Sequence, residues 1–219
     1  MKTKSVVLLS AGLDSSYNLW RAQRETEVLL VLTFAYGQRA QIREVERSER
    51  LALRLGLKHQ VVELPWFALF SESALVDHTQ DLPQGSEVSL SDMERAHKTA
   101  QQVWVPNRNG IFLNIAAGFA EGLGADQVVV GFNREEAQTF PDNSQDFIIA
   151  MDHSLSYSTA SKVKIQCYST QMDKTEIATG AKALGLPLAD LWPCYLGGEE
   201  ICRQCESCQR FLRAVGEEI

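Results

Sequence analysis

The stretch Ser5-Val6-Val7-Leu8-Leu9-Ser10-Ala11-Gly12-Leu13-Asp14-Ser15-Ser16 decides the fold of this 219-residue chain. Residues 5–9 form an apolar run that predicts a buried strand, and residues from about 14 to 25 predict a helix. The small-residue turn between them aims backbone N–H groups at one point, with the positive end of the helix dipole behind them. Such a turn is suited to binding phosphate.

The turn matches neither of the two best-known phosphate motifs. The Walker loop ends in Gly-Lys-Ser/Thr, which is absent here. The dinucleotide fingerprint has three glycines, whereas this turn has Gly12 alone. An ordinary helix cap, with Asp14 or Ser10 at the N-cap, is the alternative interpretation. The turn alone therefore leaves both interpretations open.

Apolar runs alternate with amphipathic stretches along most of the chain. Further strands are predicted at residues 27–34, 59–64, 127–131 and 163–167, and helices at about 41–55, 108–122, 144–157 and 174–184. The polar segment 65–102 interrupts this alternation and predicts an insertion or mobile loop with some helix. The pattern favours a doubly wound, parallel α/β sheet of five strands, whose ligands bind beyond the carboxyl ends of the strands.

The helix at 41–55 is predicted in most detail. Its apolar residues are spaced to form one buried stripe of Ile42, Val45, Leu51 and Leu55. Gly56 then supplies a helix stop before the next strand.

Composition bounds the class of protein. The chain is 45% hydrophobic and 22% charged, which suits one sizeable core. No segment is long and apolar enough to span a membrane, and the apolar run near the start is too short for a signal peptide. A formal net charge of −7 argues against direct nucleic-acid binding. We expect a cytoplasmic protein that acts on a small molecule.

A cysteine cluster marks the end of the chain. Its C-x7-C-x2-C-x2-C spacing places four thiols at Cys194, Cys202, Cys205 and Cys208. Four thiolates complete a closed tetrahedral zinc site, so the zinc is expected to be structural rather than catalytic. Disulfides and unrelated surface thiols are the alternatives, and a reducing cytoplasm disfavours disulfides. We expect residues 191–219 to form a zinc-binding helical region packed on an α/β domain of residues 1–190.

Several motifs together resemble a known superfamily and one family within it. Ser-x-Gly-x-Asp-Ser after a first strand resembles the S-G-G-x-D-S loop of the PP-loop ATP-pyrophosphatases, which adenylate carboxylates and related oxygens. Three more segments resemble the 7-cyano-7-deazaguanine synthases (QueC family), namely Tyr36-Gly37-Gln38-Arg39, Val105-Pro106-Asn107-Arg108-Asn109 and Trp192-Pro193-Cys194-Tyr195. The resemblance runs from about Val6 to Arg210 and implies a HUP-type (adenine nucleotide alpha-hydrolase-like) fold.

Three departures distinguish the chain from the common family pattern. Ala11 stands at the second glycine of the loop, and Ala40 stands at the histidine of Y-G-Q-R-H. Residues 131–144 replace a stretch that contains G-Y-P-D-C-R. This last segment resembles an archaeal-type branch of the family and leaves the substrate contacts open.

The resemblance implies an ATP-dependent carbon–nitrogen ligase in 7-deazapurine biosynthesis of the queuosine or archaeosine type. ATP adenylates the carboxylate of 7-carboxy-7-deazaguanine, and ammonia converts it to the amide. A second adenylation then leads to the nitrile, preQ0. The resemblance also implies ATP with Mg²⁺, one structural Zn²⁺ and a homodimer.

Candidate site residues follow from the resemblance and from the sheet edge at which they fall. ATP is expected on Leu8, Leu9, Ser10, Ala11, Gly12, Leu13, Asp14, Ser15, Ser16 and Lys164. The catalytic candidates are Asp14, Ser15, Arg39, Arg108 and Lys174. The substrate-binding candidates are Tyr36, Arg39, Asn107, Arg108, Glu135, Glu136 and Asp142. A guanine-like base needs a carboxylate to accept its N1–H and exocyclic amine, and three of these acids compete for that role. Solvated surface charges are the alternative for each ionic residue.

Two other functions compete with the ligase. Another PP-loop ATP-pyrophosphatase, tRNA-modifying or amide-forming, would usually need a reactive cysteine near the active loops or a basic surface. The first 166 residues contain no cysteine, and the net charge is acidic. A zinc-ribbon binding module without catalysis would have no need of the phosphate loop.

Overall fold

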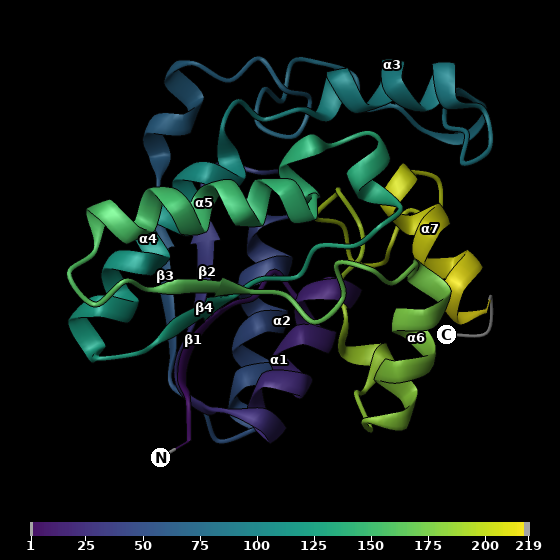
Figure 1. Ribbon diagram of the computed structural model, residues 1–219. Helices are drawn as coiled ribbons and strands as arrows, with labels where there is room; N and C mark the ends of the chain where they lie inside the picture. Colours follow the sequence, from purple (N-terminus) through teal and green to yellow (C-terminus); the bar gives the residue numbers. More distant parts are fainter. Residues whose placement is uncertain (1, 217–219) are drawn as a thin grey trace.

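Five parallel strands form the central sheet, in the order β3-β2-β1-β4-β5 (Figure 1). The computed structural model describes residues 2–216. The strands are β1 (Lys4–Leu8), β2 (Glu27–Ala35), β3 (His59–Glu63), β4 (Gln127–Val129) and β5 (Lys164–Gln166). The chain winds outward from β1 to β3 and then returns to β4 and β5 on the other side of β1. This confirms the predicted doubly wound fold and places a switch point between β1 and β4, where ligands bind in such sheets.

The centre of the sheet is apolar because helices cover both of its faces. Val7 of β1 pairs with Val31 of β2 on one side and Val129 of β4 on the other, and all three side chains are fully buried. Branched apolar residues pack well in strands of this kind. The run that opens the chain therefore forms the middle strand and carries the phosphate loop at its carboxyl end.

Helices fill the two faces and one side of the molecule. Figure 1 shows α1 (Leu13–Glu25) and α2 (Gln41–Arg54) on one face, with α4 (Arg108–Leu123) and α5 (Gln145–Ser158) on the other. At the side, α6 (Lys174–Ala183) packs between α1 and α7 (Glu206–Val215). Each of the predicted strands and helices is present, with ends that shift by no more than a few residues.

The predicted stripe on α2 is wrong at its first position. Ile42 is 77% exposed, and the fully buried residues of the helix are Ser48, Leu51 and Ala52. The burial of α2 is therefore concentrated in its second half, which packs on β2 and β3. Gly56 ends the helix as predicted, with φ at +67°.

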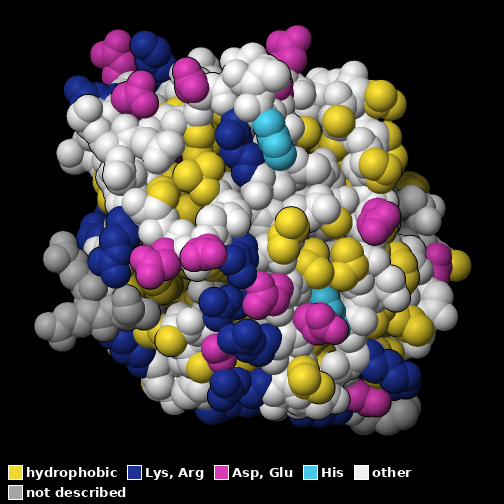
Figure 2. All heavy atoms as spheres, turned by 180° about the vertical axis from the view of Figure 1, so that it is seen from behind, with side chains coloured by type: hydrophobic (Ala, Val, Ile, Leu, Met, Phe, Trp, Pro, Cys, Tyr) yellow, Lys and Arg dark blue, Asp and Glu magenta, His cyan; other side chains and the backbone are white. Residues whose placement is uncertain are grey.

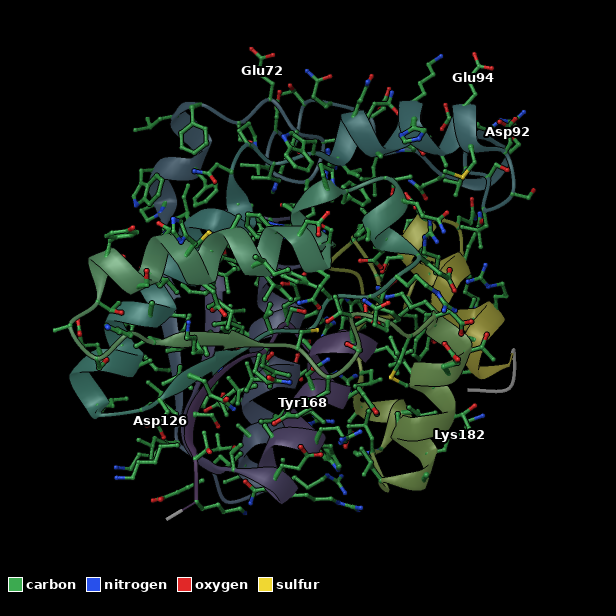
Figure 3. The ribbon with its side chains drawn as sticks, in the orientation of Figure 1. Glu72, Asp92, Glu94, Asp126, Tyr168 and Lys182 are labelled. Carbon is green, nitrogen blue, oxygen red and sulfur yellow. The ribbon has the colours of Figure 1, made fainter. Side chains whose placement is uncertain are left out.

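The segment between β3 and α4 forms a cap over one end of the sheet. It contains two short 3₁₀ turns, η1 (Pro65–Leu69) and η2 (Gly85–Glu87), and the helix α3 (Met93–Val103). Figure 3 shows Glu72, Asp92 and Glu94 projecting from this cap away from the body of the molecule. The prediction of an insertion with some helix is confirmed.

The last helix is fixed to α6. Lys182 on α6, labelled in Figure 3, donates from Nζ to the carbonyl of Val215 at 3.1 Å, at the end of α7. No helix within residues 2–216 has the length and apolarity to cross a membrane. On the face seen in Figure 2, acidic and basic side chains alternate, with hydrophobic side chains in separate patches among them.

Candidate active site

A cavity lies at the carboxyl ends of the strands. Its volume is about 250 Å³, and several parts of the chain line it, the start of α4 among them. The phosphate loop forms one wall, the residues that follow β2 and β4 form a second, and the segment from Trp192 to Phe211 contributes a third. The cavity therefore lies at the switch point between β1 and β4.

The phosphate loop presents its backbone rather than a side-chain cap. Gly12 is the N-cap residue of α1 and makes no side-chain capping bond, which excludes Asp14 or Ser10 as the cap. The first N–H groups of a helix lack intrahelical acceptors and point out of its N-terminus. The hydroxyls of Ser10 and Ser15 lie 3.2 Å apart and bond within the loop. The loop thus has the free donors and the dipole that a phosphate requires.

Close packing against another segment of the same chain fixes this loop. Gly131, just after β4, lies against the first turn of α1, and a Cβ at this position would come within 2.4 Å of the backbone nitrogen of Ser15. On the other side, the backbone N–H of Trp192 donates to the carbonyl of Ala11 at 2.9 Å. Ala11 itself adopts φ of +58°, in the left-handed region. The loop is therefore held on one side by Gly131 and on the other by the C-terminal segment that begins at Leu191, which we call the tail.

Lys174 is the cationic centre of the cavity. This first residue of α6 is 6% exposed, and its ammonium group donates to Asp14 and lies 2.8 Å from Glu136. The amide of Asn133 links the two acids, because its Nδ2 donates to Asp14 at 3.1 Å and its Oδ1 accepts the N–H of Glu136 at 2.9 Å. The second carboxylate oxygen of Asp14 is buried and has no hydrogen-bond partner among the described residues. The cluster thus retains one unsatisfied acceptor.

The pKa values in this cluster follow from burial and from the shared cation. Burial alone would lower the pKa of Lys174, but Asp14 and Glu136 outweigh it and raise the pKa, so the ammonium group keeps its charge. Burial raises the pKa of Asp14, with Lys174 opposing. Burial would also raise the pKa of Glu136, but the attraction of Lys174 lowers it. The two acids also differ in their other neighbours, because Glu136 raises the pKa of Asp14 while Arg210 lowers that of Glu136.

A second polar group lies where β2 ends. Arg108, the first residue of α4, donates to the hydroxyl of Tyr36 at 3.2 Å. Gln38 donates to Glu44, in the first turn of α2, at 2.9 Å. All four side chains line the cavity. Burial raises the pKa of Glu44, with Gln38 and Arg108 opposing. This end of the cavity therefore offers both a guanidinium group and a carboxylate.

The tail closes the cavity and carries the cysteine cluster. The sulfur atoms of Cys194, Cys202, Cys205 and Cys208 all lie within 4.8 Å of one another, so the cluster can hold a metal ion. Backbone N–H groups stabilise the sulfurs: Cys194 Sγ accepts two, each at 3.3 Å, and Cys202 Sγ accepts two, at 3.2 and 3.4 Å. Because Cys194 and its neighbours Pro193 and Tyr195 also line the cavity, the cluster shapes that wall directly.

The structure brings most of the predicted site residues together. The residues that line the cavity are Leu8, Leu9, Ser10, Gly12, Leu13, Asp14, Ser15, Tyr36, Arg108, Glu136 and Lys174. Ala11 and Ser16 belong to the same loop and are fully buried. The phosphate loop, Lys174 and Tyr36 therefore lie around one cavity, and their roles stay predictions.

Five predicted residues lie elsewhere. Lys164 begins β5, at the opposite edge of the sheet, and its side chain is 59% exposed. Arg39 binds three carbonyls of the cap, at 2.5 to 3.2 Å, instead of facing the cavity. Asn107 is the N-cap residue of α4 and is exposed. Asp142 lies near Arg108 but outside the lining, and Glu135 turns toward α7. We therefore leave Lys164 out of the site, and we assign Arg39 a role in holding the cap.

Several residues of the site were not predicted from the sequence, among them Glu44, Asn133 and Phe112. Glu44 follows the Y-G-Q-R segment and lines the cavity, and Asn133 follows β4 at the ligand edge and bridges Asp14 and Glu136. Phe112 stacks on Phe34 with ring centroids 4.1 Å apart. Of these residues, only Asn133 could have been found from the sequence, because a polar residue shortly after a buried strand falls at the sheet edge where ligands bind.

The fold and the site define an α/β enzyme of the PP-loop ATP-pyrophosphatase type. Among solved structures, the fold is similar to a 4-thiouridine synthetase–RNA complex with bound ATP, with a TM-score of 0.51 and 20% identity over 98% of this chain and 51% of that one. A sequence profile described as "Queuosine biosynthesis protein QueC" matches residues 4–218. The chain belongs to the QueC family.

Two relatives show how close this membership is. A 7-cyano-7-deazaguanine synthase of Bdellovibrio bacteriovorus is 51% identical over 212 residues, which cover 96% of this chain and 92% of the relative. One of Pelotomaculum thermopropionicum is 49% identical over 212 residues, which cover 97% and 96%. The resemblance to an archaeal-type branch stays a prediction.

Proposed function

We propose that this cavity converts 7-carboxy-7-deazaguanine and ammonia into 7-cyano-7-deazaguanine (preQ0), as an ATP-dependent ligase. One ATP adenylates the carboxylate and releases pyrophosphate, and ammonia then displaces AMP to give the amide. A second ATP adenylates the amide oxygen, which departs as AMP, and the loss of two protons leaves the nitrile. The observation that carries this proposal is that the phosphate loop, Lys174 and the polar group around Arg108 and Glu44 all line a single cavity.

The phosphate loop and Lys174 act on the departing pyrophosphate. The N–H groups at the start of α1 bind phosphate oxygens along the helix dipole. Negative charge grows on these oxygens as the bond to the α-phosphorus breaks, and a fixed cation in a water-poor cavity stabilises it strongly. Lys174 supplies this cation, since its ammonium group is buried and its pKa is raised.

Asp14 is the residue that would hold Mg²⁺. This ion binds one or two carboxylates together with substrate phosphates, and it would neutralise phosphate charge. The residues fit, because one oxygen of Asp14 is buried at the loop without any hydrogen-bond partner among residues 2–216. Glu136 offers a second carboxylate, since both acids contact Lys174.

Glu44 and Arg108 bind the two polar ends of the deazaguanine substrate. Five acids line the cavity or were predicted to bind substrate. Asp142 and Glu135 lie outside the lining, and Asp14 and Glu136 both contact Lys174. Glu44 remains, with one oxygen bound to Gln38 and the other free to accept N1–H and the exocyclic amine. Arg108 is charged, and among residues 2–216 its side chain donates one hydrogen bond, from Nη1 to Tyr36. It can therefore orient the carboxylate or amide oxygen that is adenylated.

The cysteine cluster holds a structural Zn²⁺ in this proposal. Four thiolates suit zinc, and they leave no position open for water or substrate. The division into an α/β domain of residues 1–190 and a zinc-binding region of residues 191–219 is retained, with the second region forming a wall of the active site.

The remaining partners follow from the reaction. Free ammonia is the nitrogen source, and the protein works in the cytoplasm as a homodimer without binding nucleic acid directly. A reducing compartment supports the cluster as thiolates. The acidic net charge of −7 disfavours a nucleic-acid partner.

The experiment that tests the reaction measures AMP release and the nitrile product by mass spectrometry, with Mg-ATP, ammonium and 7-carboxy-7-deazaguanine. We expect both products from the wild-type chain and a loss of at least a hundredfold in kcat for Lys174→Met. Lys164→Met is the matched control, since this exposed lysine at the opposite sheet edge should be dispensable. Absence of AMP and nitrile from folded, metal-loaded wild-type protein would contradict the proposal.

A second variant tests the assignment of Glu44. Glu44→Gln keeps the side-chain shape but turns one acceptor into a donor, so the KM for the deazaguanine acid should rise about tenfold. The KM for ATP should change less than twofold. A rise in the KM for ATP instead would show that Glu44 faces the adenine amine and would overturn the assignment.

A further inference from the structure

Two consecutive glutamates hold Lys174 at its two ends. Glu136 contacts the ammonium group at 2.8 Å, and Glu135 Oε1 accepts the backbone N–H of the same lysine at 3.0 Å. Because Lys174 is the first residue of α6, its N–H has no acceptor within the helix. A carboxylate at this position satisfies that group and complements the helix dipole. Glu135 therefore fixes the backbone from which the lysine side chain extends.

Glu135 is in turn held by α7. Arg210 donates to Glu135 Oε2 at 3.1 Å, and Arg213 donates to the same oxygen. The Arg210 side chain is only 7% exposed, and two of its nitrogens donate to Glu206 at 2.8 and 3.0 Å. A guanidinium group shared between two carboxylates in this way is fixed in direction, since its donors form a rigid fork.

The position of α7 depends on the cysteine cluster. Cys205 is the N-cap residue of the helix and Cys208 lies in its first turn, both fully buried. Arg210 follows two residues after the last cysteine. A continuous set of contacts therefore leads from the cluster, through α7 and Glu135, to the start of α6.

We infer that Arg210 is a positioning residue for the ligase reaction, which fixes the Lys174 ammonium group at the phosphate loop by holding Glu135. The inference rests on the proposed role of Lys174 in pyrophosphate release. Arg210 does not line the cavity and acts through its partners, which are Glu135 and Glu206 by hydrogen bonds and Glu136 by charge. The helix that carries two of the cysteines thus aligns the catalytic cation in addition to closing the cavity.

Kinetics of Arg210→Met test the inference. A lysine displaced by about an ångström loses much of its effect on the transition state, so kcat should fall at least tenfold. The KM for the deazaguanine acid should change less than twofold, and metal content should stay at the wild-type level. Arg134→Met is the matched control, because Arg134 joins the same loop to Asp173 and Glu176 from the solvent side. Arg210→Lys should recover part of the lost kcat.

A double-mutant cycle separates positioning from general damage. Glu135→Gln alone should lower kcat by a similar factor, and Arg210→Met should add less than twofold to it, since both act on one link. Glu135 is 19% exposed, so this variant tests the link even where Arg210→Met does not fold. Lys174 should also react faster with an amine-acylating reagent in either variant, as measured by mass spectrometry.

The outcomes distinguish the inference from the proposed function. Multiplicative losses in the cycle, or wild-type kcat in Glu135→Gln, overturn the positioning role. If Lys174→Met keeps full turnover, the proposed role of Lys174 fails instead. Inactive Lys174→Met together with fully active Arg210→Met overturns only the inference.

Discussion

The phosphate loop and the cysteine tail line the same cavity but are built in opposite ways. The loop is one contiguous turn, residues 10–16, that presents backbone N–H groups to the cavity and takes its shape from close packing. The tail brings together four side chains from residues 194–208, and its shape depends on what those sulfurs bind. Changes to loop side chains should therefore affect chemistry more than stability, whereas changes to the cysteines should affect stability first.

The two regions meet at one backbone hydrogen bond. Trp192 N–H donates to Ala11 O, and Arg43 lies over the Trp192 ring at 5.6 Å while its Nε donates to Gly198 at 2.8 Å. The tail is thus fixed to the loop on one side and to α2 on the other. Loss of tail structure should disturb the loop, and this coupling is the part of the comparison that experiments can break.

Metal removal should have the largest effect. The free energy of binding a structural zinc ion, about 10 kcal/mol or more, is gained by the folded state alone. Chelation should expose residues 191–216 to proteases, lower the Tm and abolish turnover. Cys208→Ser should do the same, whereas Cys167→Ser, a half-buried cysteine outside the cluster, should keep metal content and Tm. Lost turnover with an intact, protease-resistant tail would indicate a chemical role for the metal.

Asp14→Asn should lower kcat by about 10²–10³, or about 3–4 kcal/mol, because it removes a charged ligand and a partner of Lys174. The cost in stability should be about 1–2 kcal/mol, since the side chain is buried but Glu136 still pairs with the lysine. Ser15→Ala should cost less than about 1 kcal/mol. Steady-state kinetics and denaturant unfolding measure the two quantities. If Asp14→Asn unfolded the protein, the loop side chains would serve stability first, as we expect of the cysteines, and the contrast between loop and tail would fail.

Gly131→Ala should destabilise the protein by about 3 kcal/mol, because the new methyl group meets backbone of the loop and not a flexible side chain. The matched control is Gly122→Ala in α4, where a Cβ would meet nothing within 4 Å. Alanine favours helix, so this control should stabilise by about 1 kcal/mol. Thermal unfolding distinguishes the two, and equal Tm values would show that the loop yields more easily than its packing suggests.

The sequence predicted whatever was local. Strands, helices, the phosphate loop and the cysteine spacing are all contiguous patterns, and the structure has them where predicted. Prediction from the sequence failed where the direction of a side chain depends on partners far away in the sequence. Glu135 and Glu136 are neighbours with the same chemistry, but Arg210 draws one outward and Lys174 holds the other in the cavity.

Sheet ends were a second source of error. Lys164 was predicted in the ATP site as a cation for the departing pyrophosphate, but it begins β5, and ligands bind where strands finish. Glu44 gave no signal at all, because an acid in the first turn of a helix is usually explained by the helix dipole. Its place in the cavity is apparent only once α2 lies beside the end of β2.

The smallest expected effect concerns Ala11, where the family pattern has glycine. Ala11 adopts φ of +58°, a conformation in which a side chain is strained and glycine is not. Ala11→Gly should stabilise the protein by less than about 1 kcal/mol, because relief of strain is offset by the loss of a fully buried methyl group. Ala40→Gly, at φ of −86°, is the control and should destabilise by about 1 kcal/mol. Since Ala11 accepts the Trp192 hydrogen bond through its backbone, turnover and protease resistance of the tail should stay unchanged. A tail that loosens in Ala11→Gly would show that the buried methyl group, and not the backbone bond, couples the two regions.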